Sequence, residues 1–173
     1  RSQIERIHHV AYRCKDAKET VEWYTKHLNM QFVLAIAENE VPSTKAPDPY
    51  MHVFLDAGGG NILAFFELPT QPEMDRDRNT PTWVQHLAMK VDSLETLLEA
   101  KARLEAAGIN VIGPTNHTIF KSIYFFDPNG QIMQQLISQV HRDVMRTRDN
   151  PLYADAGALF VCAPGLARNG QEK

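Results

Sequence analysis

Positive charge is scarce in this chain. Lys and Arg together number 18 against 21 Asp and Glu, so the formal net charge is −3 at neutral pH. Nucleic acid is bound by dense basic patches, often interleaved with aromatic residues, and no such cluster stands out in the sequence. The charge balance therefore gives no electrostatic case for a nucleic-acid partner.

Long apolar runs and paired cysteines are lacking too. No apolar stretch approaches the roughly 20 residues that cross a bilayer, and residues 1–5 do not have the basic-then-apolar layout of a signal peptide. The two cysteines, Cys14 and Cys162, form neither a disulfide framework nor a metal-ligand spacing. We therefore predict a cytoplasmic protein with free thiols and no membrane partner.

What the sequence does contain is a repeat of about 77 residues, in which a strand is followed by a helix. In the first copy, alternating apolar positions over residues 7–16 predict the strand. Asp16 then opens a helical run whose predicted inner face is made of Ala17, Val21, Tyr24 and Leu28.

The second copy has the same order of elements. Residues 84–92 alternate as a strand ending at Asp92, and a helix is predicted over 93–107 with a stop at Gly108. The inner face of this helix is predicted to consist of Leu94, Leu97, Leu98, the stem of Lys101, and Leu104.

Three further strands follow each helix. They are predicted at about 31–38, 50–57 and 61–68 in the first half, and at 110–112, 118–126 and 131–137 in the second. Glycines 58–60 and the Asp-Pro-Asn-Gly sequence at 127–130 supply tight turns. The sequence thus predicts an α+β fold built from two βαβββ modules.

The domain boundaries follow from these elements. We predict one domain over residues 1–140, made of module 1 (4–68) and module 2 (82–137), with a Pro- and Asp-rich linker at 69–81. Residues 141–173 form a C-terminal tail with an apolar patch at 156–162. We expect this patch to pack on the body or on a second subunit, because it would be sticky if exposed.

Polar residues that recur in both copies are candidates for chemistry. His9 and His86 repeat in phase on the first strands, while Glu67 and Gln134 lie on the last strands. A single strand histidine is more often a hydrogen-bonded structural residue, so the repetition in phase is what favours metal binding. Two imidazoles, a carboxylate and a neutral oxygen suit a borderline divalent ion such as Fe, Mn, Co, Ni or Zn.

These residues resemble the vicinal oxygen chelate superfamily, which includes glyoxalase I, ring-cleaving extradiol dioxygenases, methylmalonyl-CoA epimerase, and the fosfomycin and bleomycin resistance proteins. The resemblance covers roughly residues 4–137. It rests on His9-Val-Ala-Tyr-Arg with Val21-Glu-Trp-Tyr24 and Leu28-Asn-Met30, on Glu67-Leu68, on His86-Leu-Ala-Met-Lys-Val-Asp92, and on Asp127-Pro-Asn-Gly130. It implies paired modules that form a cupped mixed β-sheet around one metal ion, held by His9, Glu67, His86 and Gln134. The family usually has Glu at the position of Gln134.

The nearest resemblance is to the extradiol dioxygenases. His117 precedes Ile123-Tyr124, the turn at 127–130 and Gln134 in the order and spacing of that group, except that Gln134 replaces the final carboxylate. The resemblance implies that His117 and Tyr124 are catalytic acid–base and hydrogen-bonding groups, with Fe²⁺ the favoured metal. It also implies a catecholic or related aromatic substrate, and pairing of two chains as a homodimer. Our main prediction is accordingly a metal-dependent dioxygenase.

Two alternatives stay open. If Glu67 supplies the carboxylate that Gln134 lacks, a four-ligand set more closely resembles the glyoxalase and epimerase branches, which implies a metal-dependent isomerase or lyase. Arg13, placed to reach an anionic substrate tail, slightly favours this alternative. The third possibility is a non-catalytic protein of the resistance type that binds an aromatic molecule. Its cup would be lined by Trp83, Tyr50, Phe54, Phe65 and Phe120.

Overall fold

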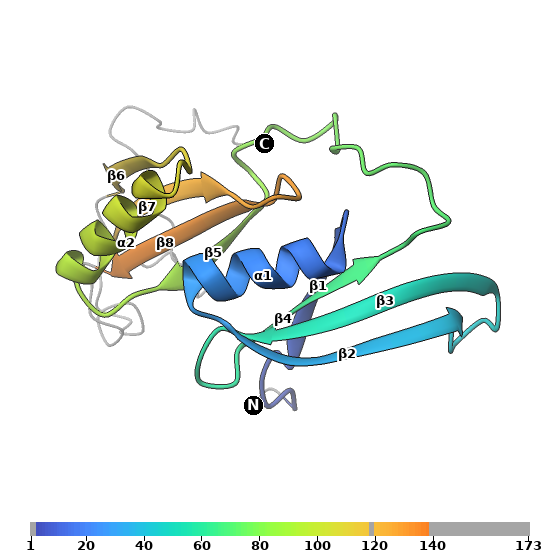
Figure 1. Ribbon diagram of the computed structural model, residues 1–173. Helices are drawn as coiled ribbons and strands as arrows, with labels where there is room; N and C mark the ends of the chain where they lie inside the picture. Colours follow the sequence, from blue (N-terminus) through green and yellow to red (C-terminus); the bar gives the residue numbers. More distant parts are fainter. Residues whose placement is uncertain (1–2, 118–119, 139–173) are drawn as a thin grey trace, which may run out of the picture.

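The structure is a computed structural model that describes residues 3–117 and 120–138, and these form two mixed four-stranded sheets with one helix each (Figure 1). Module 1 comprises β1 (His9–Cys14), α1 (Ala17–Leu28), β2 (Gln31–Glu40), β3 (Pro47–Asp56) and β4 (Ile62–Glu67). Module 2 comprises β5 (His86–Lys90), α2 (Leu94–Ala106), β6 (Ile112–Asn116), β7 (Phe120–Phe126) and β8 (Ile132–Ser138). The predicted α+β class is confirmed.

Both sheets have the same topology. The strand orders are β1-β4-β3-β2 and β5-β8-β7-β6, and in each sheet the first strand pairs with the last in parallel while the other pairs are antiparallel. The repeat seen in the sequence is therefore a repeat of topology. The predicted domain end at residue 140 and the tail 141–173 lie outside the described residues.

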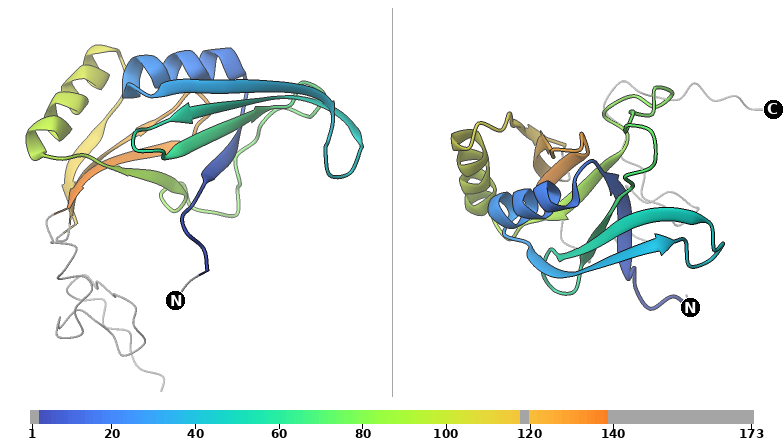
Figure 2. Two further views of the ribbon diagram at one scale, coloured as in Figure 1. Left: turned by 90° about the horizontal axis from the view of Figure 1, so that it is seen from below. Right: turned by 45° about the vertical axis from the view of Figure 1, so that its right-hand side comes forward.

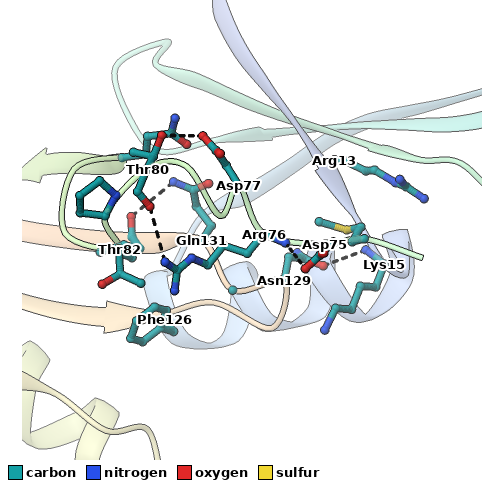
Figure 3. Close-up of a pocket in the computed structure, with 15 residues that line it drawn as sticks. Arg13, Lys15, Asp75, Arg76, Asp77, Thr80, Thr82, Phe126, Asn129 and Gln131 are labelled. Atoms are coloured by element: carbon teal, nitrogen blue, oxygen red, sulfur yellow. Dashed lines mark hydrogen bonds between the residues drawn. The ribbon is translucent and has the colours of Figure 1, made fainter. Parts of the chain in front are cut away.

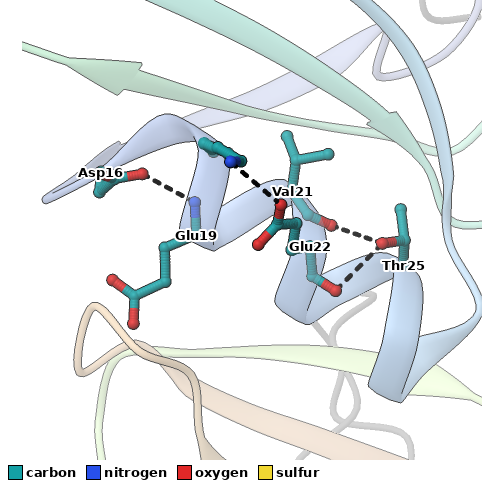
Figure 4. Close-up of polar contacts among 6 residues, drawn as sticks. Asp16, Glu19, Val21, Glu22 and Thr25 are labelled. Carbon is teal, nitrogen blue, oxygen red and sulfur yellow. Dashed lines mark hydrogen bonds and ion pairs between the residues drawn. The ribbon is translucent and has the colours of Figure 1, made fainter.

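Helix α1 begins where the sequence predicts. The Asp16 carboxylate accepts a hydrogen bond from the Glu19 backbone N–H at 2.7 Å, which satisfies a free amide of the first turn (Figure 4). Asn29 ends the helix in the left-handed conformation, with φ of 55°. The buried face is Ala17, Thr20 and Tyr24, so Thr20 takes a central place that the prediction gave to Val21.

Helix α2 lies a little differently from its prediction. Its buried residues are Leu97, Ala100 and Leu104, whereas Leu94 and Leu98 are 40% and 46% exposed. Leu98 lies about 100° around the helix from Leu97, and small Ala100 lets the helix approach the sheet along the 97–100–104 line. The apolar pattern alone was too broad to select this line.

Strand β6 also differs from prediction, because it spans Ile112–Asn116 instead of 110–112. Its pairing with β7 joins Thr115 to Ser122 and Asn116 to Lys121, with a register shift after Ile112. This edge strand contains few apolar residues, so its sequence lacks the apolar alternation from which strands are predicted.

The two modules meet at the turn between β7 and β8. The Tyr24 hydroxyl of α1 donates to the buried Asp127 carboxylate at 2.8 Å. The Asn129 side chain accepts from the Lys15 backbone N–H at 2.8 Å and donates to the Thr20 hydroxyl at 3.1 Å. Figure 2 shows the consequence, with α1 and α2 side by side on one side of the molecule.

Burial governs the protonation of the groups at this junction. It raises the pKa of the Asp127 carboxyl above its usual value, and the pKa of the Tyr24 hydroxyl rises for the same reason. The nearby Cys14 thiol is free and buried, and burial raises its pKa to about 11. Tyr24 therefore remains a hydrogen-bond donor across the range in which the protein is handled.

Among the residues that the structure describes, no helix is both long and apolar enough to span a membrane. The cytoplasmic location stays a prediction.

We expect the Tyr24→Phe substitution to lower the free energy of unfolding by about 1–3 kcal/mol, because it removes a donor from a buried carboxylate. Urea unfolding followed by circular dichroism measures this change. The control is Tyr50→Phe, which removes the hydroxyl of a partly buried tyrosine on β3 that makes no hydrogen bond to the residues the structure describes. Equal stability of the two variants would contradict the role given to the Tyr24 contact.

Candidate functional site

Strand alternation creates a polar group on one face of the second sheet. Ile123, Phe125 and Met133 are buried in the core, so their neighbours Tyr124 and Gln134 point to the opposite face. Tyr124 and Gln134 also pair directly across β7 and β8. The sheet register therefore brings these two side chains together.

A hydrogen-bond chain connects three of the predicted site residues. The Gln134 amide nitrogen donates to the Tyr124 hydroxyl at 2.8 Å, and that hydroxyl lies 3.0 Å from Nε2 of His117. Gln134 donates to the Tyr124 hydroxyl, and in the contact between that hydroxyl and His117 the imidazole tautomer decides which of the two groups donates. The centroid of the His86 ring lies 6.2 Å from the centroid of the Tyr124 ring.

These residues line a pocket of about 550 Å³ in module 2. Most of its wall is apolar: Trp83, Ile112, Phe120, Phe125, Phe126 and Ile132, joined by Thr82 and Asn110. Trp83, one of the lining residues, is 76% exposed. The pocket thus combines an aromatic wall with one polar hydrogen-bond chain.

Only two of the five aromatic residues predicted to line a cup are found in this pocket. Trp83 and Phe120 line the pocket. Phe65 does not, because it is fully buried in the core, and Tyr50 and Phe54 lie on β3 in the first sheet. Thr82, Asn110 and Ile132 were not predicted, since nothing in their sequence context marks them as pocket residues.

His9 lies away from this pocket, on β1 of the first sheet. Its Nδ1 is 2.8 Å from Nδ1 of His8, and its ring contacts those of His52 and Phe54. Burial, with a smaller effect of His9, lowers the pKa of His52. His9 thus belongs to a cluster of rings on module 1 and is not among the residues that line the pocket of module 2.

Glu67 lies on the helix-facing side of the first sheet. It has the same strand parity as buried Leu63 and Phe65, and its carboxylate accepts from the Ala17 backbone N–H at 2.7 Å. A negative charge at this position is stabilised by the positive end of the α1 dipole. The Glu67 carboxylate is therefore paired with the start of helix α1.

The sheet register identifies a different equivalent of Gln134. In module 2, His86 pairs with Ile132, and Ala88 pairs with Gln134. In module 1, His9 pairs with Ile62, and Ala11 pairs with Ala64. The counterpart of Gln134 is therefore Ala64, three residues before Glu67, and the matching of Glu67 to Gln134 by sequence repeat is corrected.

The donors present do not fit a divalent metal ion. Across residues 3–117 and 120–138, no three His, Cys, Asp or Glu side chains are grouped so as to hold one. His86 and Gln134 share the pocket, but Gln134 is uncharged and its amide nitrogen is turned to Tyr124. The position that would supply a second strand-borne oxygen carries Ala64, which has no donor atom.

Comparison with known proteins identifies the family. The chain belongs to the Glyoxalase/Bleomycin resistance protein/Dioxygenase superfamily, which matches residues 6–134. It is 28% identical to the uncharacterized protein YwkD of Bacillus subtilis strain 168 over 138 residues, which cover 79% of this chain and 98% of that protein.

Two solved structures show the shared fold. A glyoxylase/bleomycin resistance protein/dioxygenase domain from Frankia sp. EAN1pec matches with a TM-score of 0.60 and 19% identity, over 79% of this chain and all of that one. TnmS3, an antibiotic-binding protein from Streptomyces sp. CB03234, matches with a TM-score of 0.55 and 18% identity, over 80% of this chain and 100% of that one. At these identities the likeness concerns the fold alone.

The place of Glu67 can be tested by its substitution with Gln. We expect Glu67→Gln to lower the free energy of unfolding by about 1–2 kcal/mol, because the Ala17 N–H loses a charged acceptor at the helix start. Urea unfolding measures stability, and elemental analysis measures metal content of the same samples. The control, Glu73→Gln, alters an exposed linker carboxylate. A loss of bound metal with unchanged stability would contradict this role.

Proposed function

We propose that the chain binds a planar aromatic small molecule bearing a hydroxyl group in the pocket of module 2. The observation that carries this proposal is the aromatic wall around the His117–Tyr124–Gln134 hydrogen-bond chain. Its volume of about 550 Å³ is suited to a small ligand, and an apolar wall with few convergent polar groups is typical of ligand sites. TnmS3, which shares this fold, is named as an antibiotic-binding protein, so the fold is compatible with a binding role.

The hydrogen-bond chain gives the pocket a way to orient a ligand hydroxyl. A ligand hydroxyl that replaces the direct 3.0 Å contact of Tyr124 with His117 would accept from the Tyr124 hydroxyl and donate to His117 Nε2 when the imidazole proton is on Nδ1. Gln134 would hold the Tyr124 oxygen in place throughout. The ligand would then extend the existing chain without leaving a buried polar group unpaired.

We expect 1-naphthol to bind and to change tryptophan fluorescence through contact with Trp83. Tyr124→Phe should weaken its binding about 3–10-fold, as expected for the loss of one hydrogen bond, and should leave naphthalene binding unchanged. Tyr50→Phe on module 1 is the matched control. Failure of both 1-naphthol and naphthalene to bind the native protein would refute the proposal, and equal losses for 1-naphthol and naphthalene would refute the role of Tyr124.

A second candidate is extradiol-type oxygenation of a catecholic compound, favoured by the 3.0 Å contact between His117 and Tyr124. It needs a divalent metal, with Fe²⁺ preferred and Mn²⁺, Ni²⁺, Co²⁺ or Zn²⁺ as alternatives, and further donors would have to come from a second copy of the chain. The isomerase or lyase alternative stays a prediction; it assigns Glu67 to the site, whereas the Glu67 carboxylate accepts a hydrogen bond from the Ala17 backbone N–H in the structure.

The two candidates differ in their need for metal. The binding function predicts that 1-naphthol affinity is the same after dialysis against a chelator as after reconstitution with Fe²⁺. The oxygenation function requires at least about one equivalent of Fe²⁺ per site and a yellow ring-cleavage product when catechols and oxygen are added. Stoichiometric iron together with that product would displace the binding proposal.

We also propose that the protein is a homodimer formed through β2. This strand lies at an edge of the first sheet, and its Phe32, Val33, Leu34 and Ile36 are 50%, 50%, 41% and 40% exposed. An apolar edge strand of this kind is usually covered. Sedimentation velocity should show that the native protein is a dimer and that Leu34→Glu is a monomer. The control is Leu98→Glu, at a 46% exposed position of α2, which should remain dimeric. A monomeric native protein would disprove the proposal.

A further inference from the structure

A second cavity, of about 490 Å³, lies where the end of β1, the linker between the modules and the β7–β8 turn meet (Figure 3). Three of its walls, Thr82, Phe126 and Ile132, also line the aromatic pocket. The two cavities are therefore neighbours separated by shared side chains. A ligand that fills the aromatic pocket has the second cavity next to it.

The second cavity differs from the first in its charge. Its basic residues are Arg13 and Lys15, which come from β1 and the residue after it, and Arg76 from the linker. Within the described part of the chain, none of the three takes part in an ion pair. Arg13 and Arg76 donate only to the backbone carbonyls of Pro72 and Thr80.

The acidic residues of the cavity are already engaged. Asp75 forms an ion pair with Arg78 at 2.9 Å. Asp77 accepts from the Thr80 hydroxyl and from the Asn79 backbone N–H, and these hydrogen bonds lower its pKa. The carboxylates are thus turned to groups of the linker itself, and the basic side chains retain unused donors.

Arg13, which lines the cavity, carries an unsatisfied donor. Its Nε is buried and has no hydrogen-bond partner. A buried guanidinium N–H without an acceptor is unfavourable, and an anionic oxygen is its strongest acceptor. In Figure 3 the Arg76 side chain runs from the linker toward Thr82, the residue shared with the aromatic pocket.

We infer that the ligand has two parts, an aromatic body in the pocket of module 2 and an anionic group, a carboxylate or a phosphate ester, in the cavity lined by Arg13, Lys15 and Arg76. This inference rests on the proposed aromatic pocket. The linker supplies Arg76 to the basic cavity, and Thr82, just after the linker, belongs to the wall that the two cavities share. A neutral aromatic molecule would use only half of the combined space.

The experiment compares three probes of one aromatic size: 1-naphthol, 1-naphthoate and 1-naphthyl phosphate. At low salt, at least one of the two anions should bind about 5–10-fold more tightly than 1-naphthol, as expected for charge-assisted hydrogen bonds near a surface. The comparison of 1-naphthoate with 1-naphthyl phosphate shows whether the cavity prefers a carboxylate or a phosphate ester. Arg76→Gln and Arg13→Gln should each remove most of this preference while 1-naphthol binding changes less than about twofold.

The matched control is Arg103→Gln, which removes the same charge from an exposed position on α2 outside both cavities. It should leave all three affinities unchanged. Folding of each variant is checked by its 1-naphthol affinity, which depends on the aromatic pocket and not on the basic residues.

The outcomes separate the two proposals. If no probe binds, the aromatic pocket itself is disproved. If 1-naphthol binds but neither anion binds more tightly, or if the preference survives in both arginine variants, the anionic part of the ligand is disproved. Inorganic phosphate binding as tightly as 1-naphthyl phosphate would also overturn a two-part ligand, because the aromatic body would then contribute nothing.

Discussion

A buried hydrogen bond between Tyr24 and Asp127 joins the two halves of this protein. Asp127 also accepts from the backbone N–H groups of Asn129 and Gln131, so the same carboxylate shapes the turn and binds the helix of the other module. The turn connects β7 to β8, and these strands carry Tyr124 and Gln134. The polar chain of the pocket therefore depends on a contact made by α1, far away in sequence. The turn at residues 127–130, which the sequence marks only as a tight turn, therefore anchors the strands that carry the site.

The two modules share a topology but differ in chemistry. Module 2 places Gln134 opposite Tyr124 on the face away from α2, whereas module 1 has Ala64 at the matching position. Glu67 lies on the other face and stabilises the start of α1. Topological symmetry therefore does not bring a symmetric set of metal donors. Family membership establishes the fold, while the reaction or the ligand follows from side chains that differ between the halves.

The segment between β4 and β5, residues 68–85, contributes more than a connection. It lends Thr82 and Trp83 to the aromatic pocket and Arg76 to the basic cavity, and its own aspartates are held by neighbouring linker groups. Because loops can present polar groups on a rigid scaffold, such a segment can determine ligand choice without changing the fold. Two cavities of different polarity that share walls are best matched by a ligand with two chemically different parts.

The sequence by itself determined the order of elements, the start of α1 at Asp16, and the repeat of two modules, because apolar period and capping chemistry are local. It also singled out His86, His117, Tyr124 and Gln134, which the structure gathers in one pocket. Only the tertiary structure decided where Glu67 points. The run Leu63-Ala-Phe-Phe-Glu67 has no clean alternation, so the face of each side chain depends on the pairing of β4 with β1, which is a long-range contact. The same holds for the linker, whose residues gain a role only where two folded modules bring a basic cavity against an aromatic one.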